Sequence, residues 1–387
     1  MSAELIIMDD KQIGRHFQAA TIGYVLDVLP KELQDKLIKG FVEGSVTLSE
    51  GEVSTLVDSI AEKLSRLCES KRAQPKLYVV GGTVNDYETL SKLAPRKPLV
   101  KTKDDKAKGS MPSLCKWLVE ASMDVKSKPT AELKLPIFLR AYVFSKFRDI
   151  GDVEKAKVNA LTLYVATAGS IVSIIASDLK RGEASYELFL VPGTSESSLK
   201  NAGRLYTLLH LKARNLTIED IIKEILKNES LSYELCILLA IAIHIYNAAI
   251  LVEKMPSLAS IYNVLEEFKL INITPNQRPL VTWEHPLTLT HLYSELEKHE
   301  AGGLLLSLYD SITSANRYSG SVERAKDAVA QCVTGLFAYI ETKSLEPLLL
   351  CVANAQRIMD KFRELNLSDA ERSFMGLIKE IARLTTR

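Results

Sequence analysis

The chain has 387 residues, of which 47% are hydrophobic and 25% are charged, and its formal net charge is +1. These proportions are typical of a globular protein and exclude a wholly disordered chain. The near-zero net charge excludes a surface that is basic all over, so any contact with nucleic acid must come from a local cluster of bases. At about 100–200 residues for each domain, the length allows two or three domains.

The start of the chain combines strand and helix patterns. Residues 3–8 form a short apolar run typical of a strand, and residues 11–29 carry apolar side chains at helical spacing. Two further helices are predicted over residues 31–41 and 52–68, the second with Ser49 as its N-cap.

The segment 94–110 differs in composition from its surroundings. It contains two prolines and almost no large apolar side chains, which is typical of a mobile loop. Its bases outnumber its two acids and are Arg96, Lys97, Lys101, Lys103, Lys106 and Lys108. Flexible lysines can follow an irregular phosphate backbone, so the pattern predicts contact with nucleic acid, with a solvated linker that binds nothing as the alternative.

Basic character continues beyond this segment to Lys116, which we include among the predicted nucleic-acid contacts. The neighbouring Trp117 could stack on a base, but its helical context favours a place in the core.

Helical patterns dominate after Pro136. Helices are predicted over residues 137–147, 152–177, 197–212 and 218–227. The last of them should begin with a capping box formed by Thr217 and Asp220. Residues 185–191 alternate in polarity and end at Pro192, which predicts a half-buried strand.

From residue 231 onward the chain is predicted to be almost entirely helical. The closing helices, over residues 322–340, 346–365 and 369–385, have short connections typical of a bundle. The exception is the segment 272–286, which carries three prolines and is expected to be a loop.

These patterns predict an α+β fold that is mostly helical, with a mixed α/β N-terminal part and an all-helical C-terminal bundle. We expect three regions. They are a mixed α/β domain over residues 1–135, a helical region with one strand over residues 136–230, and a helical bundle over residues 231–387.

A second candidate contact with nucleic acid lies in the proline-rich segment. Asn276, Gln277 and Arg278 stand between two prolines, and these are the residue types that recognise base edges. A plain polar turn is the alternative. Asn316, with the arginine and tyrosine that follow it, is a weaker candidate of the same kind.

The sequence contains none of the motifs that would indicate catalysis. It has no phosphate-binding glycine loop, and its six histidines are not spaced as metal ligands. Two S-x-x-K tetrapeptides lack the partner motifs of a serine enzyme. We therefore predict neither a catalytic nor a metal site and no cofactor, although a site assembled from distant residues would leave no such signature.

The five cysteines are widely spaced and form no C-x-x-C pair, so they are predicted to be buried free thiols in a reducing, cytoplasmic compartment. The start of the chain lacks the pattern of a signal peptide. The apolar runs 158–176 and 235–252 are near the length of a membrane span but are predicted to be core helices. The few glutamines beside abundant lysine and glutamate favour a thermophilic source.

One part of the chain is similar to a known family. The helix N-A-L-T-L-Y-V-A-T-A-G-S at residues 159–170, followed by the strand Y-E-L-F-L-V-P at residues 186–192, resembles the large subunits of archaeal type I-A CRISPR interference complexes (Cascade). The match covers less than a tenth of the chain, includes no diagnostic motif and lacks the zinc finger of some relatives.

The resemblance implies a non-catalytic subunit that contacts the guide-RNA handle, inspects the flanking motif of duplex target DNA, and helps to open the strands. Its partners would be the other Cascade subunits and a helicase-nuclease, with base pairing supplying most of the sequence specificity. A helical scaffold that binds only other proteins is the alternative.

Overall fold

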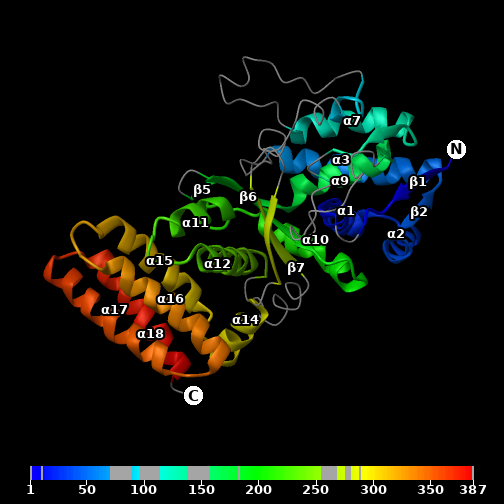
Figure 1. The fold of residues 1–387 in the computed structure, drawn as a ribbon. Helices are drawn as coiled ribbons and strands as arrows, with labels where there is room; N and C mark the ends of the chain where they lie inside the picture. The colour runs from blue at the N-terminus through cyan, green and yellow to red at the C-terminus, as the bar shows by residue number, and fades with distance from the viewer. Residues whose placement is uncertain are drawn as a thin grey trace, which may run out of the picture. The chain divides into compact units, whose positions relative to one another are not determined.

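The computed structural model divides into two compact units, unit 1 with residues 1–207 and 267–286, and unit 2 with residues 208–266 and 287–387. Figure 1 shows both units as ribbons. The residues that the structure describes are 2–9, 12–69, 89–95, 114–136, 139, 157–181, 184–253, 268–274, 280–286 and 289–385. Helices predominate and the strands form small antiparallel sheets, which confirms the predicted mostly helical α+β fold.

Unit 1 contains most of the strands. Its helical elements are α1 (Ile13–Val25), η1 (Leu26–Val28), α2 (Lys31–Glu43), α3 (Glu50–Glu69), α7 (Leu114–Ser127), α9 (Ala160–Ser173) and most of α10 (Glu196–His210). The small sheets pair β1 (Ala3–Ile6) with β2 (Ser45–Leu48), and β3 (Glu132–Lys134) with β4 (Lys157–Asn159). The largest sheet has the order β5 (Ile174–Arg181), β6 (Ala184–Pro192), β7 (Phe268–Thr274) and β8 (Leu280–Pro286).

The core of unit 1 lies where α1 packs on α9 and on strand β6. The two helices approach so closely that a Cβ atom added at Gly169 would stand 1.7 Å from the backbone oxygen of Phe17. Only glycine fits at such a contact, so this position brings the helices together.

Two predictions for this region were wrong in part. The single helix expected over residues 152–177 is replaced by β4, α9 and β5, because the side chain of Asn159 caps α9 and a β-branched run follows Ser173. The strand at 185–191 exists as β6, but it is not half-buried, since every side chain from Glu187 to Val191 is at most 1% exposed.

The predicted loop at 272–286 was also wrong, because most of it forms the hairpin of β7 and β8. The prolines at 275 and 279 fall between the strands and Pro286 ends β8, so they do not interrupt the ladder. Strand β7 pairs with β6, so this hairpin adds the last two strands to the sheet of unit 1. It does so although the sequence on both sides of it belongs to unit 2.

Unit 2 is helical throughout its described residues. Its helices are α11 (Ile218–Ile225), α12 (Tyr233–Glu253), α14 (Leu289–Lys298), α15 (Gly303–Tyr318), α16 (Ala325–Thr342), α17 (Glu346–Glu364) and α18 (Ser368–Thr385). The last four form a bundle in which α17 contacts α16 and α18, and α15 closes it against α16 and α18 (Figure 1). The three predicted closing helices are therefore confirmed.

Two predicted helix starts are also confirmed. Ser49 and Glu52 exchange hydrogen bonds between side chain and backbone at the start of α3, and Thr217 and Asp220 do the same at the start of α11. Each arrangement satisfies backbone N–H groups that the first helical turn leaves unpaired.

Helix α12 carries the second apolar run of the sequence. Its residues Tyr233–Val252 have the length and hydropathy of a membrane span, and 67% of the most apolar window is buried inside the protein. The other run forms α9, which is shorter and fully buried.

The prediction of five free thiols was wrong. Cys68 bonds Cys115 between α3 and α7, Cys332 bonds Cys351 between α16 and α17, and Cys236 is free and buried. Spacings of 47 and 19 residues gave no sign of these pairs, since helix packing brings them together. Disulfides occur mainly in oxidising compartments and in hyperthermophiles, so the cysteines no longer support a reducing compartment.

A candidate ligand-binding groove in unit 2

Of the predicted nucleic-acid contacts, Lys116 is the one that the structure describes. It lies exposed in the first turn of α7 between Cys115 and Trp117, whose side chain is only 7% exposed, as expected of a core residue. The other nine predicted contacts lie outside the described residues, and they are Arg96, Lys97, Lys101, Lys103, Lys106, Lys108, Asn276, Gln277 and Arg278.

The structure does describe where both predicted segments are attached. The disulfide between Cys68 and Cys115 holds the end of α3 beside the start of α7, with 5.6 Å between their Cα atoms. The segment 94–110 begins at Ala94, which is buried together with Leu90 and Leu93, and the structure describes the chain again from Leu114. The segment 275–279 joins Thr274 to Leu280, which are paired across the β7–β8 hairpin.

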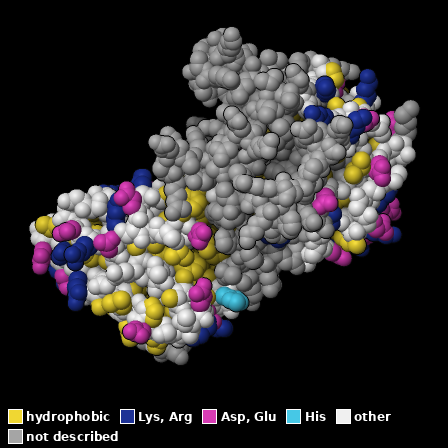
Figure 2. Space-filling view, in the orientation of Figure 1, with side chains coloured by type: hydrophobic (Ala, Val, Ile, Leu, Met, Phe, Trp, Pro, Cys, Tyr) yellow, Lys and Arg dark blue, Asp and Glu magenta, His cyan; other side chains and the backbone are white. Residues whose placement is uncertain are grey.

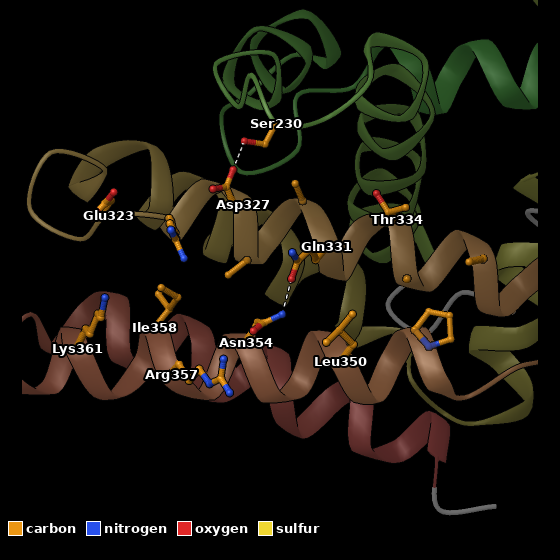
Figure 3. A pocket seen from close by; sticks show the side chains of 16 residues that line it. Ser230, Glu323, Asp327, Gln331, Thr334, Leu350, Asn354, Arg357, Ile358 and Lys361 are labelled. Carbon is orange, nitrogen blue, oxygen red and sulfur yellow. Dashed lines mark hydrogen bonds between the residues drawn. The ribbon is translucent and has the colours of Figure 1, made fainter.

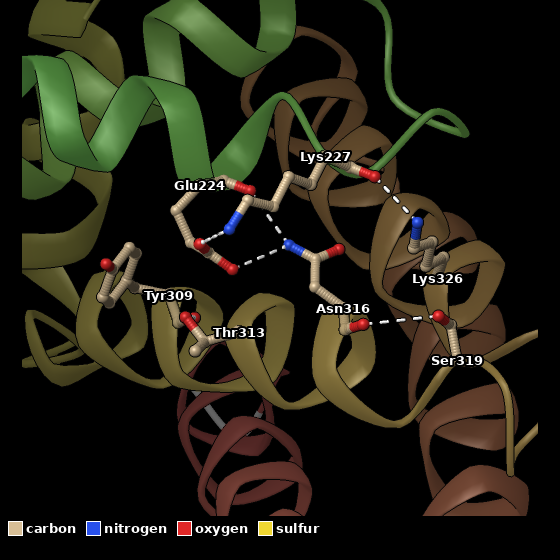
Figure 4. Close-up of polar contacts among 7 residues, drawn as sticks. All are labelled: Glu224, Lys227, Tyr309, Thr313, Asn316, Ser319 and Lys326. Carbon is tan, nitrogen blue, oxygen red and sulfur yellow. Dashed lines mark hydrogen bonds and ion pairs between the residues drawn. The ribbon is translucent and has the colours of Figure 1, made fainter.

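Asn316, the weaker candidate, has a structural role (Figure 4). Its amide donates hydrogen bonds to the backbone oxygen of Glu224, at 2.9 Å, and to the carboxylate, at 3.1 Å. The carboxylate also accepts a hydrogen bond from Lys227 at 2.6 Å. Burial raises the pKa of Glu224, but the bonds from Lys227 and Asn316 outweigh it and leave that pKa lowered. Asn316 thus joins α15 to α11.

A groove of about 940 Å³ lies between α16 and α17 in unit 2 (Figure 3). The two helices are antiparallel neighbours, and their inner faces are cross-linked by the Cys332–Cys351 disulfide. Near it, Asn354 of α17 donates a hydrogen bond to Gln331 of α16. Covalent and polar links thus fix the distance between the walls of the groove.

One end of the groove carries three bases, Arg324, Arg357 and Lys361. All three are exposed, and none forms an ion pair or side-chain hydrogen bond with another described residue. Lys and Arg side chains gather, among acidic ones, near that end of unit 2 in the space-filling view (Figure 2). Many other surface bases are paired, for example Lys227 with Glu224. The three unpaired cations can therefore bind an anionic group without first breaking an ion pair.

Two acids also line this end of the groove, but one of them is engaged elsewhere. The carboxylate of Asp327 accepts a hydrogen bond from Ser230 at 2.5 Å. Figure 3 shows Asp327 pointing toward Ser230 on one side of α16, whereas α17 lies on the other side. Glu323, which precedes the N-cap residue Arg324, is the other acid, so the three bases outnumber the one acid whose carboxylate is not engaged by Ser230.

The opposite end of the groove is apolar and lined by small residues. Leu350 is 57% exposed there, next to Pro347, Ala338 and Gly335. A Cβ atom on Gly335 would stand 2.8 Å from the backbone oxygen of Pro347, so glycine permits the close approach of α16 and α17. The groove thus combines an anion-binding end with an apolar end.

Sequence reasoning missed this groove. Arg357 and Lys361 are four residues apart on one helix face, which is a visible pattern, but Arg324 joins them only through the antiparallel packing of α16 on α17. Among the described residues, no group of three or more His, Cys, Asp or Glu side chains could hold a metal ion.

No protein-family model matches the chain, and a search of curated proteins finds no match to it.

Proposed function

We propose that this protein is a non-catalytic subunit that binds nucleic acid. The observation that carries the proposal is the set of three unpaired cations, Arg324, Arg357 and Lys361, at one end of a groove. Phosphate groups spaced along a strand are a fitting ligand for cations on two neighbouring helices. The basic segment 94–110, which lies between the buried Leu93 and the start of α7, supplies a second phosphate contact in this proposal.

The particular assembly that we propose is a type I-A CRISPR interference complex in the cytoplasm of a thermophilic archaeon. Support comes from the resemblance over residues 159–170 and 186–192, which lie in α9 and β6. In this proposal the protein contacts the handle of the guide RNA and the target DNA. The rest of its near-neutral surface binds the other subunits and the helicase-nuclease.

The proposal predicts that binding to DNA depends on salt. A variant carrying Arg324→Asn, Arg357→Gln and Lys361→Gln should bind more weakly, and its plot of log affinity against log salt should flatten by about one unit for each phosphate that is no longer neutralised. The asparagine suits the left-handed backbone at Arg324, where φ is 64°.

Three exposed bases of α18 outside the groove, Arg372, Lys379 and Arg383, provide the matched control. Changing them to glutamine removes the same charge and should leave the slope nearly unchanged. Equal effects of the two triple variants would reduce the interaction to general charge and exclude a site in the groove.

The predicted segments have separate tests. Changing Lys101, Lys103, Lys106 and Lys108 to glutamine should also flatten the salt dependence, and unchanged binding would remove the segment from the proposal. Alanine at Asn276, Gln277 and Arg278 should reduce discrimination between flanking sequences more than total affinity. An equal loss on all sequences would contradict base recognition there.

A second candidate function, protein binding without nucleic acid, is favoured by exposed leucines on α17. Leu349 and Leu350 are 58% and 57% exposed, and Leu345, just before the helix, is 39% exposed. Clustered apolar side chains of this kind mark protein contacts. If the purified chain, alone and with its partners, binds no polynucleotide at low salt, the adaptor function replaces the first proposal.

A further inference from the structure

We infer that the groove between α16 and α17 selects single-stranded nucleic acid over duplex. Phosphates would lie at the basic end and a base would lie against the apolar end. This inference rests on the proposed function and specifies the ligand of the same site.

The first observation in favour of a single strand is that the groove is confined. Its walls are two directly packed helices, joined by a disulfide with 4.6 Å between Cα atoms and by the Asn354–Gln331 hydrogen bond, so the groove of about 940 Å³ follows the surface seam of α16 and α17. A single strand can turn both its phosphates and an unstacked base toward this seam. A duplex keeps its bases paired and stacked, and unstacking one step costs a few kcal/mol, so it would contact the seam with its backbone alone.

The second observation in favour of a single strand is the arrangement of positive charge in the groove. Arg357 and Lys361 stand one turn apart on α17, about 6 Å along the axis, and Arg324 comes from the opposite wall. Cations spaced in this way can contact successive phosphates from both sides. A duplex lying across the rim would reach the exposed side-chain ends but not the floor, where Ile358 is buried.

The third observation in favour of a single strand is the apolar end of the groove. Leu350 and Pro347 offer an aliphatic surface, and Gly335 and Ala338 leave room beside it. Leucine and proline are among the apolar side chains that proteins place against base faces once a base step has been unstacked. A base is available for this contact only when it is unstacked, so the apolar end should bind a single strand more tightly than a duplex.

The test compares the full-length protein bound to a labelled single-stranded oligonucleotide and to a duplex of the same length and sequence, by fluorescence anisotropy at low salt. Single strands should bind at least about tenfold more tightly, which corresponds to a free-energy difference of about 1.4 kcal/mol. Leu350→Glu places a carboxylate in the groove and should weaken single-strand binding about tenfold or more.

Leu349→Glu is the matched control. Leu349 is on the same helix, is equally exposed and does not line the groove, so its substitution adds the same charge outside the site and should change affinity little. Circular dichroism of both variants should show an unchanged helix content, because both positions are on the surface.

The outcomes separate this inference from the proposed function. Equal affinity for single strand and duplex, or equal effects of Leu349→Glu and Leu350→Glu, would overturn the single-strand inference even if the cation variants still bind more weakly. Displacement of the oligonucleotide by poly-glutamate as effective as that by unlabelled single strand would assign the groove to an acidic peptide. Failure to bind any polynucleotide would overturn the proposed function as well.

Discussion

Unit 1 and unit 2 are stabilised by contacts of different range along the chain. In unit 1, Gln18 of α1 donates to the backbone oxygen of Ile6 and accepts from Met8, both at 2.8 Å. Thr162 of α9 accepts from the backbone of Ile6 at 3.0 Å although 156 residues separate them. Buried polar side chains thus take the place of strand partners for the segment around β1, because unpaired backbone groups are costly when buried.

Unit 2 depends far more on local patterns. Its helices have apolar stripes facing the core, and several exposed ion pairs join residues three apart, as with Arg363 and Asp360 or Arg372 and Asp369. Exposed pairs of this kind contribute only a few tenths of a kcal/mol. The helices of unit 2 are therefore stabilised mainly by periodic burial, to which links such as that from Asn316 to Glu224 are added. The fold of unit 1 depends more on a few close contacts between residues far apart in the sequence.

Removal of the two disulfides should cause the greatest change in stability. In the chain-entropy view, closing 47 residues in unit 1 stabilises the folded state by roughly 4 kcal/mol, and closing 19 residues in unit 2 by roughly 3 kcal/mol. Cys68→Ser with Cys115→Ser should therefore destabilise more than Cys332→Ser with Cys351→Ser, as measured by urea denaturation. Cys236→Ala, at a free thiol, is the control, and a thiol titration that finds five reactive groups after unfolding without reductant would contradict both bonds.

The next effect contrasts one glycine from each unit. Gly169→Ala would place its Cβ atom 1.7 Å from the backbone of Phe17, so α1 and α9 must separate, at a cost of about 3 kcal/mol. Gly376→Ala, inside α18, would meet nothing closer than Ser307 at 3.4 Å and should stabilise unit 2 by about 0.5–1 kcal/mol. Thermal denaturation should show a lower melting temperature for Gly169→Ala and a higher one for Gly376→Ala. Shifts of the same sign and size would contradict the difference in packing at the two glycines.

The same contrast explains what could be predicted from the sequence. The helices of unit 2 follow a 3.6-residue period, so the closing helices were predicted to within about three residues, and the capping box at Thr217 was predicted directly. In unit 1, α9 and the start of β5 were merged into one helix because the apolar run 158–176 continues from one into the other without a break in polarity.

The candidate site was harder to predict for the same physical reason. A run of lysines such as Lys101 to Lys108 is visible in the sequence, whereas a groove made by Arg324 on one helix and Arg357 on the next exists only after the helices pack. The disulfides were missed likewise, since neither cysteine pair is close in the sequence.

A histidine in the core of unit 2 should give a smaller effect than the loss of either disulfide or Gly169→Ala. Burial lowers the pKa of His244 in α12 to about 4, although hydrogen bonds to the backbone of Leu209 and Leu208 act in the opposite direction. The unfolded chain binds a proton near pH 6.5, so the stability due to neutral His244 is fully present above that pH and is lost as the pH falls toward 4. At pH 5 the loss should be about 2 kcal/mol, at 1.36 kcal/mol for each pH unit.

Burial raises the pKa of Asp310 in unit 2 although Arg214 lowers it, so protonation of Asp310 adds stability as the pH falls and acts against the loss due to His244. Two other acids of unit 2 do not contribute above about pH 4.5. Burial raises the pKa values of Glu224 and Glu295, but their lysine hydrogen bonds outweigh it and leave both lowered from 4.5, so the stability that they contribute is lost only below about pH 4.5. Urea denaturation of wild type between pH 6.5 and 4.5 should therefore show unit 2 weakening first. His244→Gln, which keeps a hydrogen-bond donor for Leu209, should flatten this pH dependence, while His291→Gln on the surface should not. Parallel slopes for all three proteins would show that His244 does not control the acid stability of unit 2.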